Sequence, residues 1–219
     1  MQPEKIFPPD VAMADLFGPF DSIAVVGNSP RLVEKRQGGE IDAHDVVVRI
    51  NDGRTAPHEA STGSRTTVRF VGALLKDRYR GFFSGLREEA RLVTSAENVQ
   101  SLADFGWSGR LEVIEQLGWT IRSSFTRLAS VIEIGELPDK NPRTGIIVLS
   151  LLVDAMRAGR KVSVYGMETE PRKTGAEHFY ADGRDFGAVL KGYGKYHCPM
   201  TVEFSMLKQL QDRALVTVN

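Results

Sequence analysis

The chain has 219 residues, 42% hydrophobic and 26% charged, which is an ordinary globular composition at a length that suits one domain. Because 28 basic residues balance 28 acidic ones, a bulk electrostatic binder of nucleic acid is excluded, and no nucleic-acid partner is expected. The single cysteine, Cys198, excludes an intrachain disulfide, and the first 20 residues hold no long apolar run, so we expect a cytoplasmic protein without a transmembrane segment.

The N-terminal half predicts a sheet of short buried strands. Residues 1–20 are polar and proline-rich, which predicts a surface lead-in with a helical turn, and residues 21–219 are expected to form a single domain. Apolar runs at Ser22–Val26, Val46–Ile50 and Thr67–Val71 predict strands. With helical patterns between such runs, the sequence predicts an α/β fold with a Rossmann-like, mostly parallel sheet flanked by helices.

The remaining elements follow from apolar periodicity and from turn residues. Two further strands are expected at Leu92–Ser95 and Val162–Tyr165. Gly38-Gly39 is expected to end the first helix, Thr201 to cap the last one, and Asp52–Gly63 to be a loop. The expected helices are Arg31–Arg36, Leu74–Glu89, Ala96–Phe105, Ile146–Arg157 and Thr201–Leu215.

Small polar residues follow the predicted strands, at the edge where α/β sheets bind ligands. Gly27-Asn28-Ser29 and Asn51 each come directly after a strand, and Thr144-Gly145 begins a buried helix whose free N–H groups can bind an anion. Taken together they predict a nucleotide phosphate held by main chain and amide groups. Each turn taken alone is more often structural, and the prediction depends on their joint order.

Metal chemistry finds little support in the sequence. The chain has no Asp-x-Asp pair for a metal bound to a diphosphate, and Glu168-Thr169-Glu170, the nearest substitute, reads as a solvated loop. No Cys/His cluster has zinc spacing. We therefore expect no metal and no cofactor, and a donor with less charge than a diphosphate, such as a nucleoside monophosphate sugar.

The order of the short motifs resembles that of the animal-type sialyltransferases. The residues that match the large and small sialylmotifs of that family are Val26-Gly27-Asn28-Ser29, Ile41-Asp42-Ala43-His44-Asp45, Arg49-Ile50-Asn51, Gly63-Ser64-Arg65-Thr66-Thr67, Pro142, Thr144, Gly145, Tyr165 and Gly166. The resemblance implies a variant GT-A-like glycosyltransferase, here a soluble, bacterial-like relative. It departs from the family at Arg143, where a small hydroxyl residue is usual, and in the spacing to Glu203.

Two histidines in polar loops are the candidates for acid–base chemistry, because imidazole titrates near neutral pH. His178, followed by Phe179-Tyr180, resembles the third motif of the family, and His197 resembles the last. The resemblance implies that His197 is the catalytic base and His178 the partner of the leaving phosphate. Tyr180 could hydrogen-bond the donor, and it is equally suited to the core. The alternative is two surface histidines. A nucleophilic pair of His197 and Cys198 is disfavoured, because adjacent residues of an extended chain point opposite ways.

The resemblance implies an inverting, metal-independent transfer of sialic acid from CMP-sialic acid to a sugar hydroxyl of a glycan or glycolipid acceptor. Three alternatives stay open: another CMP-keto-sugar such as CMP-Kdo as donor, a non-catalytic CMP-binding module, and a Rossmann dehydrogenase. The dehydrogenase is the weakest, because Gly27-Asn28-Ser29-Pro30 lacks the glycines that a dinucleotide pyrophosphate requires.

Overall fold

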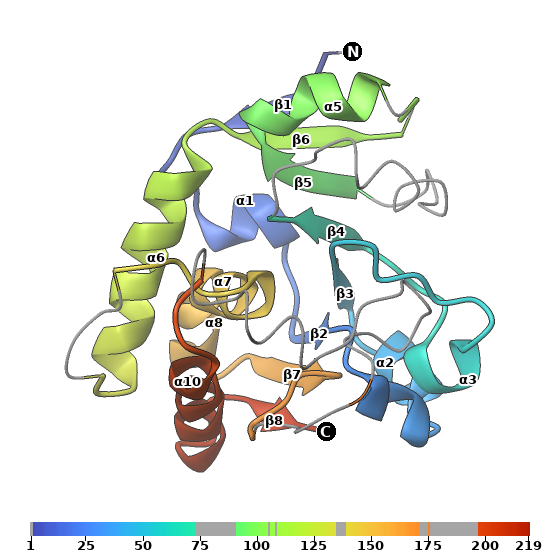
Figure 1. The fold of residues 1–219 in the computed structure, drawn as a ribbon, viewed down its shortest axis with the longest axis vertical. Helices are drawn as coiled ribbons and strands as arrows, with labels where there is room; N and C mark the ends of the chain where they lie inside the picture. Colours follow the sequence, from blue (N-terminus) through green and yellow to red (C-terminus); the bar gives the residue numbers. More distant parts are fainter. Residues whose placement is uncertain are drawn as a thin grey trace.

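The computed structural model describes residues 2–72, 91–104, 106–107, 109–134, 139–170, 175 and 197–219, and within them the chain forms one parallel sheet (Figure 1). The sheet has eight strands in the order β1-β6-β5-β4-β3-β2-β7-β8, and every adjacent pair is parallel. The strands are β1 (Lys5–Phe7), β2 (Ser22–Val26), β3 (Val46–Ile50), β4 (Val68–Val71), β5 (Arg91–Ser95), β6 (Leu111–Ile114), β7 (Lys161–Tyr165) and β8 (Thr217–Val218).

The strand order reverses direction beside β2. From β2 the chain adds β3, β4, β5 and β6 on one side, and then returns to place β7 on the other side of β2. At such a switch point the connections leave the two neighbouring strands in opposite directions, so a crevice opens at their carboxyl ends. The predicted strands Ser22–Val26 and Val162–Tyr165 are therefore the pair that frames the ligand edge of the sheet.

Helices cover both faces of the sheet, which is why β3 is buried along its whole length. In Figure 1 one face carries the helices drawn to the left of the sheet, and the opposite face carries a short group drawn to the right. The first group is α6 (Leu117–Val131), α7 (Thr144–Leu151), α8 (Val153–Arg157) and α10 (Met200–Asp212), packed together with α1 (Met13–Phe17). The opposite group includes η1 (Pro30–Glu34), α2 (Gly38–Asp42) and α3 (Glu59–Thr62), and α5 (Val99–Asp104) follows η3 (Ala96–Asn98) after β5.

The N-terminal segment differs from the expected surface lead-in. Residues Lys5–Phe7 form β1 and pair with β6 at the edge of the sheet, and Phe7, Leu16 and Phe17 are buried in the main core. The expected helical turn is present as α1. Three residues are too few for an alternation of apolar and polar side chains to indicate a strand. β1 forms because β6 offers an edge with which it can pair.

Several helix boundaries also differ from the expectations. Gly38 and Gly39 begin α2 instead of ending the preceding helix, which is the five-residue 3₁₀ helix η1. The predicted loop at 52–63 contains the helical turn α3, the helix predicted at 146–157 is divided at Leu152 into α7 and α8, and α10 is capped by Pro199 instead of Thr201. The helix expected at 74–89 lies outside the described residues.

The strands expected at 22–26, 46–50, 92–95 and 162–165 are confirmed, and the strand expected at 67–71 begins one residue later. The helical region expected at 96–105 is present as η3 and α5. Among the helices of the described ranges, none combines the length and the apolar character needed to cross a bilayer.

Candidate functional site

The carboxyl ends of β2 and β7 are fastened to each other at the switch point. The amide of Gly27 donates to the carbonyl of Tyr165 at 2.8 Å, and the amide of Ser29 donates to the carbonyl of Gly166 at 3.0 Å. A Cβ on Gly27 would lie 2.3 Å from the Gly166 oxygen, and Gly166 itself has a φ of +60°. Both positions therefore require glycine, because a side chain would separate the strand ends or strain the turn.

Two asparagine amides connect neighbouring strand ends across this edge. Asn28 Nδ2 donates to the carbonyl of Ile50 at 3.1 Å, which ties the turn after β2 to the end of β3. Asn51 Nδ2 donates to Thr144 Oγ1 at 3.4 Å, and its Oδ1 accepts from the amide of Gly72 at 3.4 Å. A primary amide has two N–H donors and two lone pairs, so these bonds leave each asparagine with capacity for a ligand.

Thr144 and Gly145 form the first turn of α7, an eight-residue helix that begins at this edge. The first N–H groups of a helix have no partner within it and carry the positive end of the helix dipole. A Cβ on Gly145 would lie 2.6 Å from Met167 Cε, so the strand-end loop after β7 packs directly against the helix end. The structure thus brings Asn28, Asn51, Thr144 and Gly145 to one edge, as the sequence predicts, and the arrangement suits a bound phosphate.

Ser29 has a structural role that the sequence did not indicate. Its hydroxyl donates to Glu168 and accepts from the amide of Arg31 at 3.3 Å, so it caps η1. Arg31 in turn lies 3.5 Å from Glu170 in an exposed ion pair. The predicted solvated loop at 168–170 is therefore anchored to the turn after β2, and the nucleotide-binding role of Ser29 stays a prediction.

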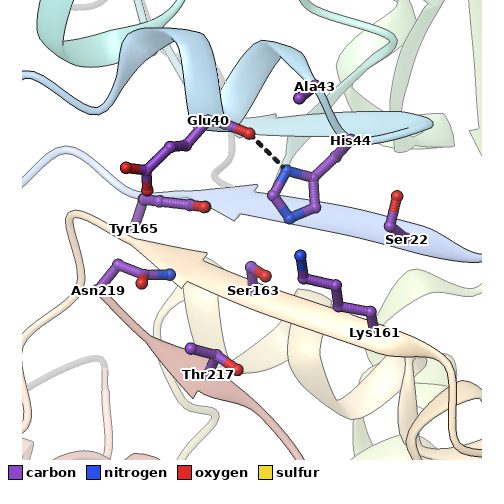
Figure 2. A pocket seen from close by; sticks show the side chains of 9 residues that line it. All are labelled: Ser22, Glu40, Ala43, His44, Lys161, Ser163, Tyr165, Thr217 and Asn219. Atoms are coloured by element: carbon purple, nitrogen blue, oxygen red, sulfur yellow. Dashed lines mark hydrogen bonds between the residues drawn. The ribbon is translucent and has the colours of Figure 1, made fainter.

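The ring of Tyr165 lies apart from these residues. Its carbonyl belongs to the switch point, but its side chain packs with Ile41 and Val47 on the face of the sheet opposite α7. There it lines a separate cavity together with His44 (Figure 2). The structure therefore does not bring the Tyr165 ring together with Asn51 and Thr144, and His178 and Tyr180 lie outside the described residues.

His197 is half-buried and precedes α10 in a segment that is fastened to the start of α7. The amide of Cys198 donates to the carbonyl of Asn141 at 3.1 Å, and Cys198 Sγ lies 3.6 Å from Glu203 Oε1. Burial and the neighbouring Glu203 carboxylate raise the pKa of Cys198 to about 12. The thiol therefore stays protonated at neutral pH and is not a nucleophile, which agrees with the sequence argument.

The two departures from the sialyltransferase pattern contact each other. Glu203 Oε1 accepts from the amide of Arg143 at 2.9 Å, and Arg143 Nε donates to Glu203 Oε2 at 2.7 Å. The Glu203 side chain is only 3% exposed, so its charge depends on this arginine for compensation. The pair joins the segment that carries His197 to the residue that caps α7, which the sequence alone could not reveal because 60 positions separate the two residues.

Buried arginines hold the turns that border the crevice. Of these, the sequence motifs include Arg49 but not Arg69. Arg69 Nη1 donates to the carbonyls of Asn51, at 3.0 Å, and of Asp52, which fixes the turn after β3. Arg49 donates to the carbonyl of Thr62 at 2.8 Å, and burial and the nearby Arg69 lower the pKa of Arg49 to about 10. Arginines inside apolar strands are the signal that could have identified these contacts, because buried charges need partners.

The Gly63–Thr67 segment braces the edge of the sheet instead of facing the crevice. Asp42 accepts from the amides of Ser64, at 2.8 Å, and Arg65, at 3.0 Å, and Arg65 Nη1 donates to the carbonyl of His44 at 2.8 Å. Ser64 and Arg65 therefore brace the turn that leads into β4. Burial raises the pKa of Asp42, but these hydrogen bonds outweigh it and the net pKa is lowered.

Comparisons with known proteins agree with this architecture. The chain is 25% identical over 215 residues to human beta-galactoside alpha-2,6-sialyltransferase 1. This match covers 88% of the chain and 50% of the relative. It is also 43% identical over 60 residues to a type 2 lactosamine alpha-2,3-sialyltransferase of Rattus norvegicus, and 40% identical over 52 residues to the beta-1,6-galactosyltransferase GALT29A of Arabidopsis thaliana. These matches cover 18% and 13% of the two relatives, so the chain spans at most half the length of these relatives.

A crystal structure of a mammalian sialyltransferase has the same fold, with a TM-score of 0.56 and 19% identity over 94% of this chain and 76% of that one. The sequence profile described as glycosyltransferase family 29 (sialyltransferase) matches residues 9–215, nearly the whole chain. The matched region contains every described residue of the switch-point edge. The chain therefore belongs to glycosyltransferase family 29, the sialyltransferase family.

Proposed function

We propose that this chain transfers sialic acid from CMP-sialic acid to a sugar hydroxyl of a glycan or glycolipid, with inversion and without a metal. The observation that carries the proposal is the convergence of Asn28, Asn51, Thr144 and Gly145 at the switch point of a family 29 fold. Main-chain N–H groups at the start of α7 and two amides supply donors for one phosphate. A single phosphate needs less charge compensation than a diphosphate, which makes a CMP-sugar the best-matched donor.

The proposed reaction is one displacement at the anomeric carbon of the donor. His197 takes the proton of the acceptor hydroxyl, whose oxygen forms a bond to the anomeric carbon on the side opposite the phosphate. The bond between that carbon and the phosphate oxygen breaks at the same time, and its electron pair leaves with CMP. His178 donates a hydrogen bond to the departing phosphate, and the N–H groups at the start of α7 stabilise the same negative charge.

The family name alone leaves the donor sugar open, because one relative is named a galactosyltransferase. CMP-Kdo would share the cytidine and phosphate contacts of CMP-sialic acid. UDP-galactose would bring a second phosphate. The choice among these donors is therefore an experimental question, and the nucleotide is the first thing to measure.

The test is calorimetric titration of the purified chain with CMP, CDP and UDP, with and without EDTA, followed by transfer assays. The assays offer CMP-sialic acid, CMP-Kdo or UDP-galactose to Gal-beta-1-3GalNAc-ortho-nitrophenol, the molecule bound in a second mammalian sialyltransferase structure with a TM-score of 0.54. We expect EDTA-insensitive binding of CMP and transfer from CMP-sialic acid, with the anomeric configuration of the product read by NMR. Metal-dependent binding of UDP alone would contradict the proposal.

An Asn51→Asp variant tests the placement of the phosphate. Asn51 has a φ of +52°, a conformation that aspartate also tolerates, so the variant keeps the turn and adds a negative charge beside the donor phosphate. We expect the affinity for CMP to fall at least about tenfold, which corresponds to 1.4 kcal/mol. Gln211→Glu makes the same charge change on an exposed position of α10 and is the matched control. Equal affinities in the two variants would remove Asn51 from the site.

A further inference from the structure

We propose that the chain has a second carbohydrate-binding site, on the face of the sheet opposite α7, which takes one neutral hexose unit. The site is a cavity of about 380 Å³ between α2 and the strands β7 and β8, of which β8 is the edge strand. Its floor is buried and consists of His44, Ser163 and Tyr165, and Glu40, Lys161 and Thr217 stand exposed at its rim (Figure 2). A volume near the lower end of the range for ligand pockets, about 300–1,000 Å³, suits a small ligand.

His44 presents a hydrogen-bond acceptor to this cavity. The residue is 5% exposed, and Nδ1 of its ring lies 2.9 Å from the carbonyl oxygen of Glu40 and 3.3 Å from that of Ile41. Carbonyl oxygens only accept, so Nδ1 donates to them, and in the tautomer protonated at Nδ1 alone the lone pair lies on Nε2. Within the part of the chain that the structure describes, this buried Nε2 has no hydrogen-bond partner. In Figure 2 the ring points from the end of α2 toward Ser163 and Lys161.

A buried acceptor without a partner is uncommon in folded proteins and indicates that a ligand or water supplies the missing donor. The groups beside His44 indicate what kind of molecule supplies this hydrogen-bond donor. Ser163 and Tyr165 share a hydrogen bond, and burial together with the charge of Glu40 raises the pKa of Tyr165, so the phenol keeps its proton. The Tyr165 ring meets His44 edge to face at 5.9 Å, which gives the floor a rigid shape.

The rim of the cavity carries charges of both signs and favours an uncharged ligand. Lys161 and Glu40 have opposite signs, so the cavity favours neither an anion nor a cation. Among the described residues, no three His, Cys, Asp or Glu side chains gather as metal ligands. A hexose carries several hydroxyls that each donate and accept, so different hydroxyls of one unit can satisfy Nε2 of His44, the hydroxyls of the floor and the charged rim. This site is independent of the proposed transfer, because its residues other than Tyr165 lie outside the switch-point crevice.

The experiment is NMR of the uniformly ¹⁵N-labelled chain, observing the imidazole nitrogens while methyl β-D-galactopyranoside is added. The spectrum of His44→Gln identifies the His44 signals. We expect the Nε2 signal of His44 to shift at sugar concentrations up to about 50 mM, as for a millimolar Kd, and to shift equally when CMP saturates the crevice. Lys161→Met and Ser163→Ala should each weaken the binding at least about threefold.

Lys208→Met is the matched control, because it makes the same substitution at an exposed position of α10. It should leave the sugar affinity unchanged. An unchanged His44 signal in the wild-type chain would mean that the cavity holds water only and would overturn the proposal. A shift caused by inorganic phosphate but not by the galactoside would make the cavity an anion site, and loss of the shift with CMP would place the sugar in the crevice. Either result would also overturn it.

Discussion

Two buried glutamates at opposite ends of the molecule are held by the same chemistry. Glu203 is 3% exposed and accepts from Arg143, whereas Glu112 in β6 is 1% exposed and accepts from Arg91 in β5. Glu112 also lies 2.9 Å from Arg110, so its charge has a second partner. The pair at β5 and β6 joins two adjacent strands, and the Arg143–Glu203 pair joins the His197 segment to the start of α7.

The difference shows how one interaction serves two purposes in the same fold. Both ion pairs compensate a charge that burial would otherwise make costly. Only the Arg143–Glu203 pair also links the segment of a proposed catalytic histidine to the helix start of a proposed phosphate site. Loss of either pair should therefore reduce stability. Only loss of the Arg143–Glu203 pair should also reduce the rate of transfer.

The largest effect on stability is expected from Arg143→Leu. Without the guanidinium, the buried Glu203 carboxylate keeps only hydrogen-bond donors, and the free energy of unfolding should fall by about 3 kcal/mol. Turnover should fall about tenfold at a temperature where the variant is folded, because a small misplacement of the base slows transfer. Urea unfolding and the transfer assay measure the two effects.

Arg91→Leu is the control for this comparison. It should also lose stability, although less, because Arg110 still contacts Glu112. Its turnover should match that of the wild-type chain. If both variants lost turnover in proportion to stability, the Arg143–Glu203 pair would have no particular role in positioning His197. Partial recovery of the rate in Arg143→Lys would support that role.

The largest effect on turnover, next to this loss of stability, is expected from His197→Ala. Removal of the base should lower kcat about a hundredfold or more and leave CMP affinity within about threefold of the wild-type value, because the α7 end is unchanged. Stopped assays and calorimetry measure the two quantities. A folded variant with wild-type kcat would show that the Arg143–Glu203 pair anchors a segment with no catalytic base.

The smallest effect concerns Asp42, a carboxylate held by main-chain N–H groups instead of an arginine. Its pKa is lowered in the folded chain, against about 3.9 when unfolded. It therefore contributes stability above about pH 4, and this contribution is lost as the pH falls through the folded pKa. Asp42→Asn should make the unfolding free energy less dependent on pH below 4. Equal pH dependence in both chains would mean that Asp42 makes no net contribution.

Much of the fold and of the crevice could be predicted because the signals are local. Apolar runs identified β2, β3, β5 and β7, and the residues directly after them identified Asn28 and Asn51. Parallel strands bring their carboxyl ends to one edge wherever the chain goes between them, so such residues converge without knowledge of the strand order. The motif match named Tyr165 but did not indicate on which face of the sheet its ring lies, because a matching motif does not specify which way a strand residue points.

By itself the sequence determined the α/β class, the strand ends and the glycines and amides of the crevice, since each depends on neighbouring residues. Only the tertiary structure decided which distant residues meet: β1 with β6, Asn51 with Thr144 across 93 positions, and Arg143 with Glu203 across 60. The physical reason is that an isolated charge or a three-residue strand has no local preference strong enough to show in the sequence. Its place is set by the one partner that compensates its charge or its unpaired backbone groups.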